Sequence, residues 1–389
     1  MFNFDFQNPT RIVFGKDRLG SINDLVPQNA TVLITYGGGS AVKSGLITHV
    51  KTILGDRKVF DFGGIEPNPH YETLIKAVEI VRNENIDFIL AVGGGSVIDG
   101  TKFITLASNY NGAPSDLLKF GFTPIPMDVV PKAVPFGAVL TLPATGSEMN
   151  NGAVISYEHG KFPVKSQLTY PKFSILDPTL TFTLPRIQVA NGIVDTFVHT
   201  TEQYLTYPVD ARIQDRFAEG ILQTLVEIGV QTIEEPENYG ARANLVWSAT
   251  MALNGIIGTG VPQDWTTHMI GHELTALFGI DHGQTLAIIY PALLEIRKEQ
   301  KRAKLLQYAE RVWNIQTGSN DNKIDLAILK TRDFFESLGI RTKLSQYGVG
   351  KDKIPLIIEQ LKAHGLTSLS ETRDITLEVS QKILERAFA

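Results

Sequence analysis

The fold is decided by the stretch IDFILAVGGGSVIDGTK at residues 86–102, in which an apolar run ends in three glycines and a helical pattern follows. The same arrangement occurs earlier, as TVLITYGGGSAVKSG at residues 31–45. Apolar runs that end at a glycine turn and continue into a helix are typical of buried parallel strands with crossover helices. Bare backbone N–H groups beside a helix N-terminus favour binding of an anion such as a phosphate. The two copies therefore predict a nucleotide-binding α/β domain.

The two halves of the chain differ in pattern. Residues 31–143 alternate short β-rich runs with amphipathic segments, as in a parallel sheet with crossover helices. After the run LDPTLTFTLP, which ends at Pro185, long stretches of helical periodicity take over. We therefore expect a Rossmann-like α/β domain at residues 1–185 and an all-α domain at residues 186–389, which suits a chain of this length.

The composition excludes several classes of protein. The chain has no cysteine, which rules out disulfides, thiolate nucleophiles and cysteine-ligated metals. Its net charge of −5 gives no electrostatic reason to bind nucleic acid or an anionic membrane. We find neither a signal-peptide pattern nor an apolar run long enough to span a bilayer. We expect a cytoplasmic protein whose partners are small molecules.

The first glycine turn favours NADP over NAD, provided that the ligand is a dinucleotide. In NAD-binding proteins, a carboxylate near the end of a strand hydrogen-bonds to the ribose 2′-hydroxyl. Binding of the 2′-phosphate of NADP requires that this carboxylate be absent and that a cation lie nearby. Here the turn has no carboxylate and consists of Gly37, Gly38, Gly39 and Ser40, with Lys43 close behind. A third turn, TLPATGSEMNNG at residues 141–152, offers further candidate cofactor contacts, namely Thr141, Thr145, Ser147 and Asn150.

Histidines supply a second chemical signal. Asp195 and His199 lie four residues apart in a helical pattern, so both side chains point from one face. His268 and His272 repeat this spacing, and His282 follows the expected end of their helix. One carboxylate with several imidazoles is a usual ligand set for zinc or ferrous iron. A zinc hydrolase is disfavoured, because HMIGHE matches neither H-E-x-x-H nor H-x-x-E-H.

These motifs together resemble one enzyme family. GGGSVIDGTK, TLPATGSE, LDPTLTFTLP, GIVDTFVHTTEQY and HMIGHELTALFGIDHG are similar to segments of the iron-containing, or group III, alcohol dehydrogenases, over essentially the whole chain. The match is best to the bacterial branch of butanol dehydrogenases and broad-specificity NADPH-dependent aldehyde reductases. The resemblance implies a dehydroquinate synthase-like architecture, with metal and nicotinamide meeting in the cleft between two domains, and a homodimer.

The resemblance also implies roles for particular residues. The family's four metal ligands fall on Asp195, His199, His268 and His282, and His272 matches a histidine that lies beside the nicotinamide and the metal. Either His272 or a water next to the metal can supply the proton that must follow the hydride. The remaining family matches are cofactor contacts, at Asn68, Gly94, Gly95, Ser96, Asp99 and Lys161.

The implied reaction is reversible hydride transfer between NADPH and the carbonyl of an aldehyde, giving a primary alcohol, with one divalent metal, Zn²⁺ or Fe²⁺. Three alternatives remain open. One is an NAD-dependent polyol oxidoreductase resembling glycerol dehydrogenase, and another is a lyase resembling dehydroquinate synthase. The third is a non-enzymatic nucleotide-binding sensor, which has no reason to keep the aspartate and histidine constellation.

Overall fold

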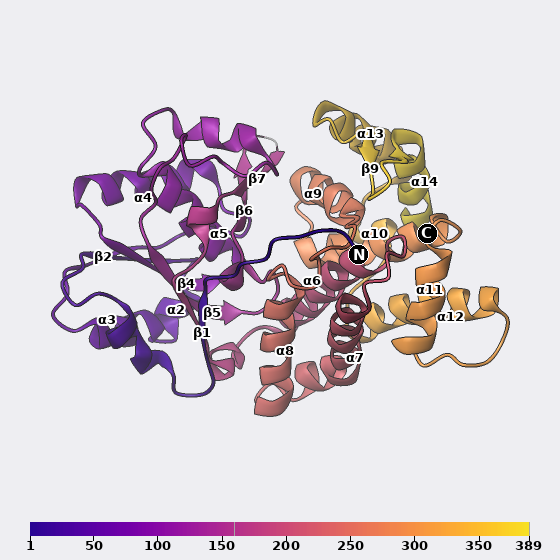
Figure 1. The fold of residues 1–389 in the computed structure, drawn as a ribbon, viewed down its shortest axis with the longest axis horizontal. Helices are drawn as coiled ribbons and strands as arrows, with labels where there is room; N and C mark the ends of the chain where they lie inside the picture. Colours follow the sequence, from indigo (N-terminus) through magenta and orange to yellow (C-terminus); the bar gives the residue numbers. More distant parts are fainter. Residues whose placement is uncertain (159, 389) are drawn as a thin grey trace. The chain divides into compact units, whose positions relative to one another are not determined.

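The computed structural model describes residues 1–158 and 160–388, and the chain divides into two compact units. The first, which we call the sheet unit, comprises Gln7–Thr183. The second, the helical unit, comprises Met1–Phe6 and Leu184–Ala389. Figure 1 shows the sheet unit in indigo to magenta and most of the helical unit in orange to yellow.

The sheet unit is built on a six-stranded parallel sheet. Its strands are β1 (Arg11–Phe14), β2 (Val32–Tyr36), β3 (Val59–Phe62), β4 (Phe88–Gly94), β5 (Phe136–Leu142) and β8 (Phe173–Leu176). Their order across the sheet is β1-β8-β5-β4-β2-β3, and every neighbouring pair is parallel. The central strands β2 and β4 are almost wholly buried, as expected where helices cover both faces.

The connections from β2 and β4 leave in opposite directions along this sheet. The chain passes from β2 to β3 on one side, and from β4 to β5 on the other. In open α/β sheets, ligands bind beyond the carboxyl ends of the strands at such a switch point. The register pairs Tyr36 with Val92, so the glycines that follow these two residues are neighbours. The two GGGS turns therefore meet at one expected ligand-binding position.

Helices cover both faces of the sheet. They are α1 (Ile22–Leu25), α2 (Ser40–Lys43), α3 (Leu46–Leu54), α4 (Tyr71–Asn83) and α5 (Gly95–Ala107). On one face, Val50 of α3 belongs to a buried cluster with Ile34 and Leu90 of the strands. On the opposite face, the hydroxyl of Thr101 in α5 lies 2.7 Å from that of Thr35 in β2. The expected alternation of strands and crossover helices is present.

An antiparallel hairpin, β6 (Gly152–Tyr157) and β7 (Gly160–Lys165), follows β5. The sequence pattern did not predict it, because a glycine opens each strand and Pro163 interrupts the second. β6 packs against α5, the helix that begins at the second glycine turn. The loop at residues 145–152 is thereby held between β5 and this hairpin.

The helical unit consists of long helices around α10. They are α6 (Arg186–Tyr204), α7 (Arg212–Glu234), α8 (Tyr239–Ala252), α9 (Thr266–Phe278), α10 (His282–Ile296), α11 (Arg302–Arg311), α12 (Asn320–Ser337), α13 (Ile354–Ala363) and α14 (Leu377–Phe388). α10 packs against α6, α9, α12 and α14. A short antiparallel ribbon, β9 (Ser368–Leu369) with β10 (Ile375–Thr376), was not expected in a domain predicted to be all-α, since two-residue strands leave no period-2 pattern.

The first six residues lie on the helical unit as an extended arm. The backbone N–H of Phe2 donates to the carbonyl oxygen of Gly260 at 2.9 Å, and the Phe2 ring packs edge-on against Tyr207. The side chains of Phe2, Phe4 and Phe6 remain 39–52% exposed.

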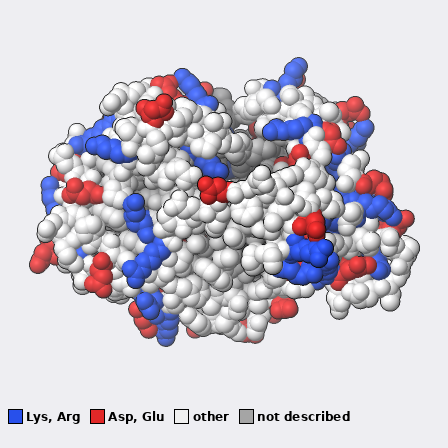
Figure 2. All heavy atoms as spheres, viewed as in Figure 1, with Lys and Arg blue, Asp and Glu red and all other residues white. Residues whose placement is uncertain are grey.

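Two observations describe the surface. Among the described residues, no helix has the length and apolar character needed to cross a bilayer. On the face shown in Figure 2, acidic and basic side chains are interspersed, which is typical of a solvated surface.

Candidate active site

The helical unit gathers the acidic and histidine residues of the predicted metal site. α6 carries Asp195 and His199 one turn apart, α9 carries His268, and α10 begins at His282. α10 approaches α6 closely because its second residue is Gly283, where a Cβ atom would lie 2.5 Å from a backbone oxygen of α6. Three helices therefore bring side chains that are far apart in the sequence into one cluster.

The spacing of the ligand atoms fits a divalent cation. Oδ1 of Asp195 lies 3.6 Å from Nε2 of both His268 and His282. This separation is long for a hydrogen bond, whereas two ligands each about 2.1 Å from a tetrahedral ion stand about 3.4 Å apart. The ligand atoms of these three residues all lie within 4.8 Å of one another. Among the described residues, none hydrogen-bonds to the buried Asp195 Oδ1 or His268 Nε2, and a cation would satisfy both atoms.

The charges of this cluster depend on one another. Burial alone raises the pKa of Asp195, but the nearby imidazoles of His199, His268 and His282 hold it well below its usual range. Burial alone lowers the pKa of His268, but the carboxylates of Glu202 and Asp195 raise it to about 9. Asp195 is therefore an anion at neutral pH, and His268 holds a proton that a bound cation would displace.

His199 and His272 lie beside this cluster of ligand atoms. Nδ1 of His199 lies 3.4 Å from Oδ1 of Asp195, and its ring stacks on that of His268 with centroids 4.5 Å apart. Among the described residues, the group of mutually close ligand atoms holds Asp195, His268 and His282 and not His199. The ring of His272 lies 5.3 Å from that of His282. His199 as fourth ligand and His272 as proton donor stay predictions.

Glu202 was not singled out from the sequence, yet it contacts the cluster. Its buried carboxylate accepts the backbone N–H of Thr267 at 2.6 Å and contacts Nδ1 of His268. A carboxylate at Nδ1 fixes the tautomer and orientation of the ring, so that Nε2 is presented to a cation. The sequence held a signal, because Asp195, His199 and Glu202 follow the i, i+4, i+7 spacing of one helix face.

Trp265 was also missed. It precedes α9 with a φ of 64°, in a region that bulky residues seldom adopt. Its ring packs edge-on against His268, with centroids 5.3 Å apart, and against His199 at 6.0 Å. The indole therefore forms one wall of the cluster of candidate metal ligands.

The glycines of the second turn are required by close packing within the sheet unit. A Cβ at Gly94 would lie 3.0 Å from Cβ of Leu142, and one at Gly95 would overlap the side chain of Thr145. The end of β5 and its loop can therefore approach the start of α5 closely. This contact brings the predicted residues Thr145, Gly94 and Gly95 together.

The first turn has a different local environment. A Cβ at Gly38 would meet nothing within 4 Å, and Gly39 has a φ of 115°, which favours glycine. Ser40 and Lys43 begin and end the short helix α2 and are exposed. The backbone of this turn is thus open to a ligand, with a cation one helical turn away.

Three predicted cofactor residues from separate segments meet beside the second turn. Asn68, which has a left-handed φ of 56°, donates its backbone N–H to Oγ of Ser96 at 3.1 Å. Its side-chain oxygen accepts a hydrogen bond from Lys161 at 2.8 Å. The side chains of Asn68 and Lys161 are therefore already oriented by protein contacts.

Asp99, Ser147 and Asn150 also come together, around a residue that the sequence analysis did not single out. Lys102 of α5 donates hydrogen bonds to Ser147 and Asn150, and the hydroxyl of Ser147 donates to Asp99. Thr141, at the end of β5, is half-buried. The signal for Lys102 was weak, because a lysine in a helical pattern is usually exposed.

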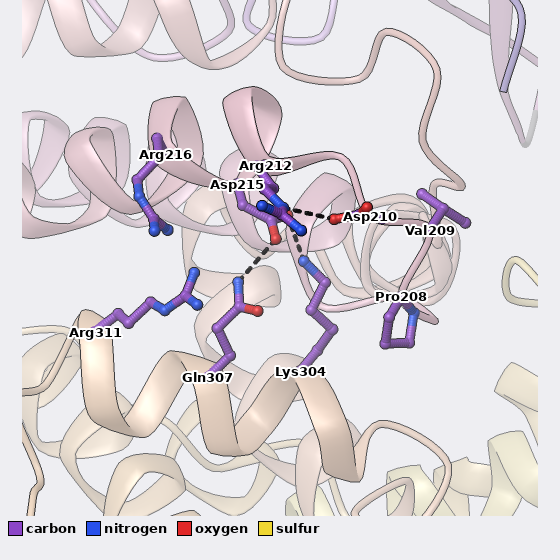
Figure 3. A pocket seen from close by; sticks show the side chains of 9 residues that line it. All are labelled: Pro208, Val209, Asp210, Arg212, Asp215, Arg216, Lys304, Gln307 and Arg311. Atoms are coloured by element: carbon purple, nitrogen blue, oxygen red, sulfur yellow. Dashed lines mark hydrogen bonds and ion pairs between the residues drawn. The ribbon is translucent and has the colours of Figure 1, made fainter. Parts of the chain in front are cut away.

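A separate hollow of about 490 Å³ lies between α7 and α11 of the helical unit (Figure 3). It contains four cations, but their contacts are to carboxylates of the protein. Lys304 contacts Asp215, Arg212 donates to Asp210 at 2.8 Å, and Arg311 donates to Glu219 at 3.0 Å. This hollow is an ion-pair network, and we assign it no ligand.

Comparison with known proteins identifies the family. The model for iron-containing alcohol dehydrogenases matches residues 9–178, and the model for the C-terminal part of that family matches residues 189–388. The chain is 57% identical to the NADPH-dependent aldehyde reductase YqhD of Escherichia coli, with 100% of each chain covered. It is 37% identical to NADH-dependent butanol dehydrogenase A of Clostridium acetobutylicum, again with 100% of each covered.

Solved structures of relatives have the same fold as this chain. The substrate- and cofactor-free form of the aldehyde reductase YqhD from E. coli has a TM-score of 0.93 and 55% identity, covering 99% of this chain and 100% of that one. NADH-dependent butanol dehydrogenase A of Thermotoga maritima has a TM-score of 0.93 and 34% identity, covering 100% and 99%. The predicted fold class and the resemblance found in the sequence are confirmed, and the chain belongs to the iron-containing alcohol dehydrogenase family.

Proposed function

We propose that this chain is a metal-dependent NADP(H) alcohol dehydrogenase that acts mainly as an aldehyde reductase, giving primary alcohols. The observation that carries the proposal is the cluster in which the buried Asp195 and His268 and the half-buried His282 present mutually close ligand atoms. The carboxylate of Glu202 lies beside them. The 57% identity to an NADPH-dependent aldehyde reductase supports the reaction and the cofactor. The same cluster argues against a non-enzymatic sensor.

In this proposal, Asp195, His199, His268 and His282 hold one Zn²⁺ or Fe²⁺. When bound, the metal polarises an aldehyde carbonyl and the dihydronicotinamide supplies the hydride. Glu202 holds His268 in the orientation that a metal ligand needs. His272, one turn after His268, supplies the proton that the product alkoxide needs, since an imidazole titrates near neutral pH.

The preference for NADP(H) rests on the first glycine turn. The adjacent strand β3 does carry a carboxylate, Asp61, but it accepts hydrogen bonds from Lys51 at 2.6 Å and Tyr36 at 3.0 Å. Lys51 is the main cause of the lowered pKa of Asp61, because its ammonium donates to that carboxylate. With Asp61 engaged, the open backbone at Gly38 and the cation of Lys43 suit a 2′-phosphate.

Further parts of the proposal follow the family resemblance. Residues 1–185 act as the dinucleotide-binding domain and residues 186–389 as the metal-binding, catalytic domain. The protein forms a homodimer, for which the exposed phenylalanines of the N-terminal arm offer apolar surface. A cytoplasmic location stays a prediction.

The metal role is tested with His268→Ala and His282→Ala. Both variants should lose metal, measured by elemental analysis, and lose aldehyde reduction while still binding NADPH. Full turnover in both would refute the metal role. The same assay with NADH, polyols and acidic substrates separates the proposed reductase from a polyol oxidoreductase and from a lyase.

A further inference from the structure

Lys102 lies at the centre of a hydrogen-bond network in the sheet unit. Its side chain is fully buried on α5. The ammonium donates to Oγ of Ser147 at 2.8 Å, to Oδ1 of Asn150 at 2.8 Å and to the carbonyl oxygen of Gly152 at 2.7 Å. An ammonium has three N–H donors, and each of them has an acceptor in the loop at residues 145–152.

Asp99 completes the network from the same side of α5. Its carboxylate accepts the hydroxyl of Ser147 at 2.5 Å and the backbone N–H of Val154 at 2.9 Å. Asp99 and Lys102 are three residues apart and therefore neighbours on the helix surface. Together they fasten the segment 147–154 to α5 at four points.

The polar groups of the loop are engaged within the protein. Ser147 donates its only hydroxyl hydrogen to Asp99 and accepts from Lys102. Oδ1 of Asn150 accepts from Lys102 and from the backbone N–H of Gly152 at 3.0 Å, while its amide nitrogen donates to the carbonyl oxygen of Gly146 at 3.0 Å. These side chains therefore give the loop its shape.

The loop is also fixed to the second glycine turn. α5 begins at Gly95, directly over which Thr145 packs, so one rigid helix joins the turn to the loop. A buried ammonium is expensive unless it is paired, and apolar packing of similar volume is often no less stable. Burial of Lys102 is thus better explained by the geometry that it imposes than by stability.

We propose that Asp99 and Lys102 are positioning residues that lock the loop at residues 145–152 against the second glycine turn, forming this part of the cofactor site before the dinucleotide binds. The inference rests on the proposed function, because it takes the loop and the turn as the cofactor site. A preformed loop spares binding the free energy of ordering it. Asp99, Ser147 and Asn150 then act through the loop rather than as direct contacts.

The test compares Lys102→Met with the double variant Asp99→Asn/Lys102→Met, which removes the buried ammonium together with the charge of its neighbour Asp99. Lys76→Met, at an exposed position on α4, is the matched control. NADPH affinity is measured by the fluorescence of the bound cofactor, metal affinity by Co²⁺ titration and stability by thermal unfolding. Because small misplacements of binding groups are costly, Lys102→Met should weaken NADPH binding by roughly tenfold to a hundredfold.

The double variant separates positioning from stability. It should regain thermal stability relative to Lys102→Met while NADPH binding stays weak and Co²⁺ affinity stays at the wild-type value. Should Lys102→Met fail to fold, Asp99→Asn alone, which keeps the shape of the side chain, should still weaken NADPH binding. NADPH affinity within twofold of wild type in the double variant would overturn the inference. Failure of the wild-type protein itself to bind NADPH would instead refute the proposed function.

Discussion

Replacing Glu202 by glutamine should weaken metal binding without removing any metal ligand. The carboxylate of Glu202 accepts the backbone N–H of Thr267 and contacts Nδ1 of His268, and both partners are buried. Glutamine keeps the size of the side chain but replaces one acceptor oxygen by an NH₂ group. One of the two buried donors then faces another donor.

The expected magnitude follows from these contacts. Leaving one buried donor unsatisfied costs about 1–3 kcal/mol, and loss of a carboxylate that orients a metal-bound histidine typically weakens affinity roughly 10–100-fold. The two estimates agree, because tenfold in affinity corresponds to about 1.4 kcal/mol. We therefore expect the dissociation constant for Zn²⁺ to rise by about one to two orders of magnitude in Glu202→Gln.

The assay is a competition for Zn²⁺ between the metal-free protein and a chromophoric chelator. It is best run near pH 9, because the pKa of His268 is about 9 and removal of Glu202 would lower it. At pH 7 the easier loss of that proton would offset part of the weakened binding. Glu273→Gln is the matched control, since Glu273 is a buried carboxylate of α9 that pairs with Nδ1 of a different histidine, His364, at 2.8 Å.

Equal Zn²⁺ affinity of Glu202→Gln and wild type at pH 9 would refute this account of Glu202. An equal loss in Glu273→Gln would refute it too, since the effect would then arise from any buried carboxylate of the unit. Retained thermal stability with weakened Zn²⁺ binding is the combination that the structure predicts.

Three further predictions concern single positions. Gly38→Asp, placed where a side chain has open space, should reduce NADPH affinity by roughly tenfold or more through repulsion of the 2′-phosphate and spare NADH, as cofactor titrations will show. Trp265→Phe should abolish most of the fluorescence quenching caused by Co²⁺, because Trp265 lies against the metal cluster; unchanged quenching would place the reporter at another tryptophan. Burial lowers the pKa of Lys102 from 10.5 to about 8, against the opposing charges of Asp99 and Glu148. The unfolded chain then binds one more proton between these values, so wild-type unfolding free energy should rise with pH from about 8 to 10.5 by up to about 1.4 kcal/mol per unit relative to Lys102→Met, as denaturant titrations across this range will test.

The sequence was most informative where chemistry and periodicity coincide. Asp195 with His199, and His268 with His272, could be paired from helical spacing alone, and the apolar runs before the glycines identified β2 and β4. Glu202 shares the helix face of Asp195, but the sequence alone does not distinguish a buried glutamate from an exposed one as long as its partner is unknown. That partner, His268, is 66 residues away and comes close only in the folded chain.

The hairpin and the Lys102 network were not predictable for a related reason. Lys102 lies on a helix and its hydrogen-bond acceptors at residues 147–152 lie in a loop. Neither helical nor strand periodicity in the sequence therefore indicates that they are in contact. Residue type misled as well, since a lysine is rarely buried and the three acceptors of its ammonium lie 45 to 50 residues further along the chain. The depth of burial of a charge is set by tertiary packing, which no window of sequence contains.

The two GGGS turns show that one short sequence can serve opposite physical purposes. At the second turn, protein atoms of Leu142 and Thr145 occupy the space that side chains would need, so the glycines serve internal packing as well as backbone exposure. At the first turn, the space beside Gly38 is open, so a side chain there is absent without a packing reason. Relatives that share the fold are named for NADH as well as for NADPH. The shared fold therefore does not choose the cofactor, and we propose that the first turn does, because an open position beside Gly38 is where a carboxylate would be accommodated or left out.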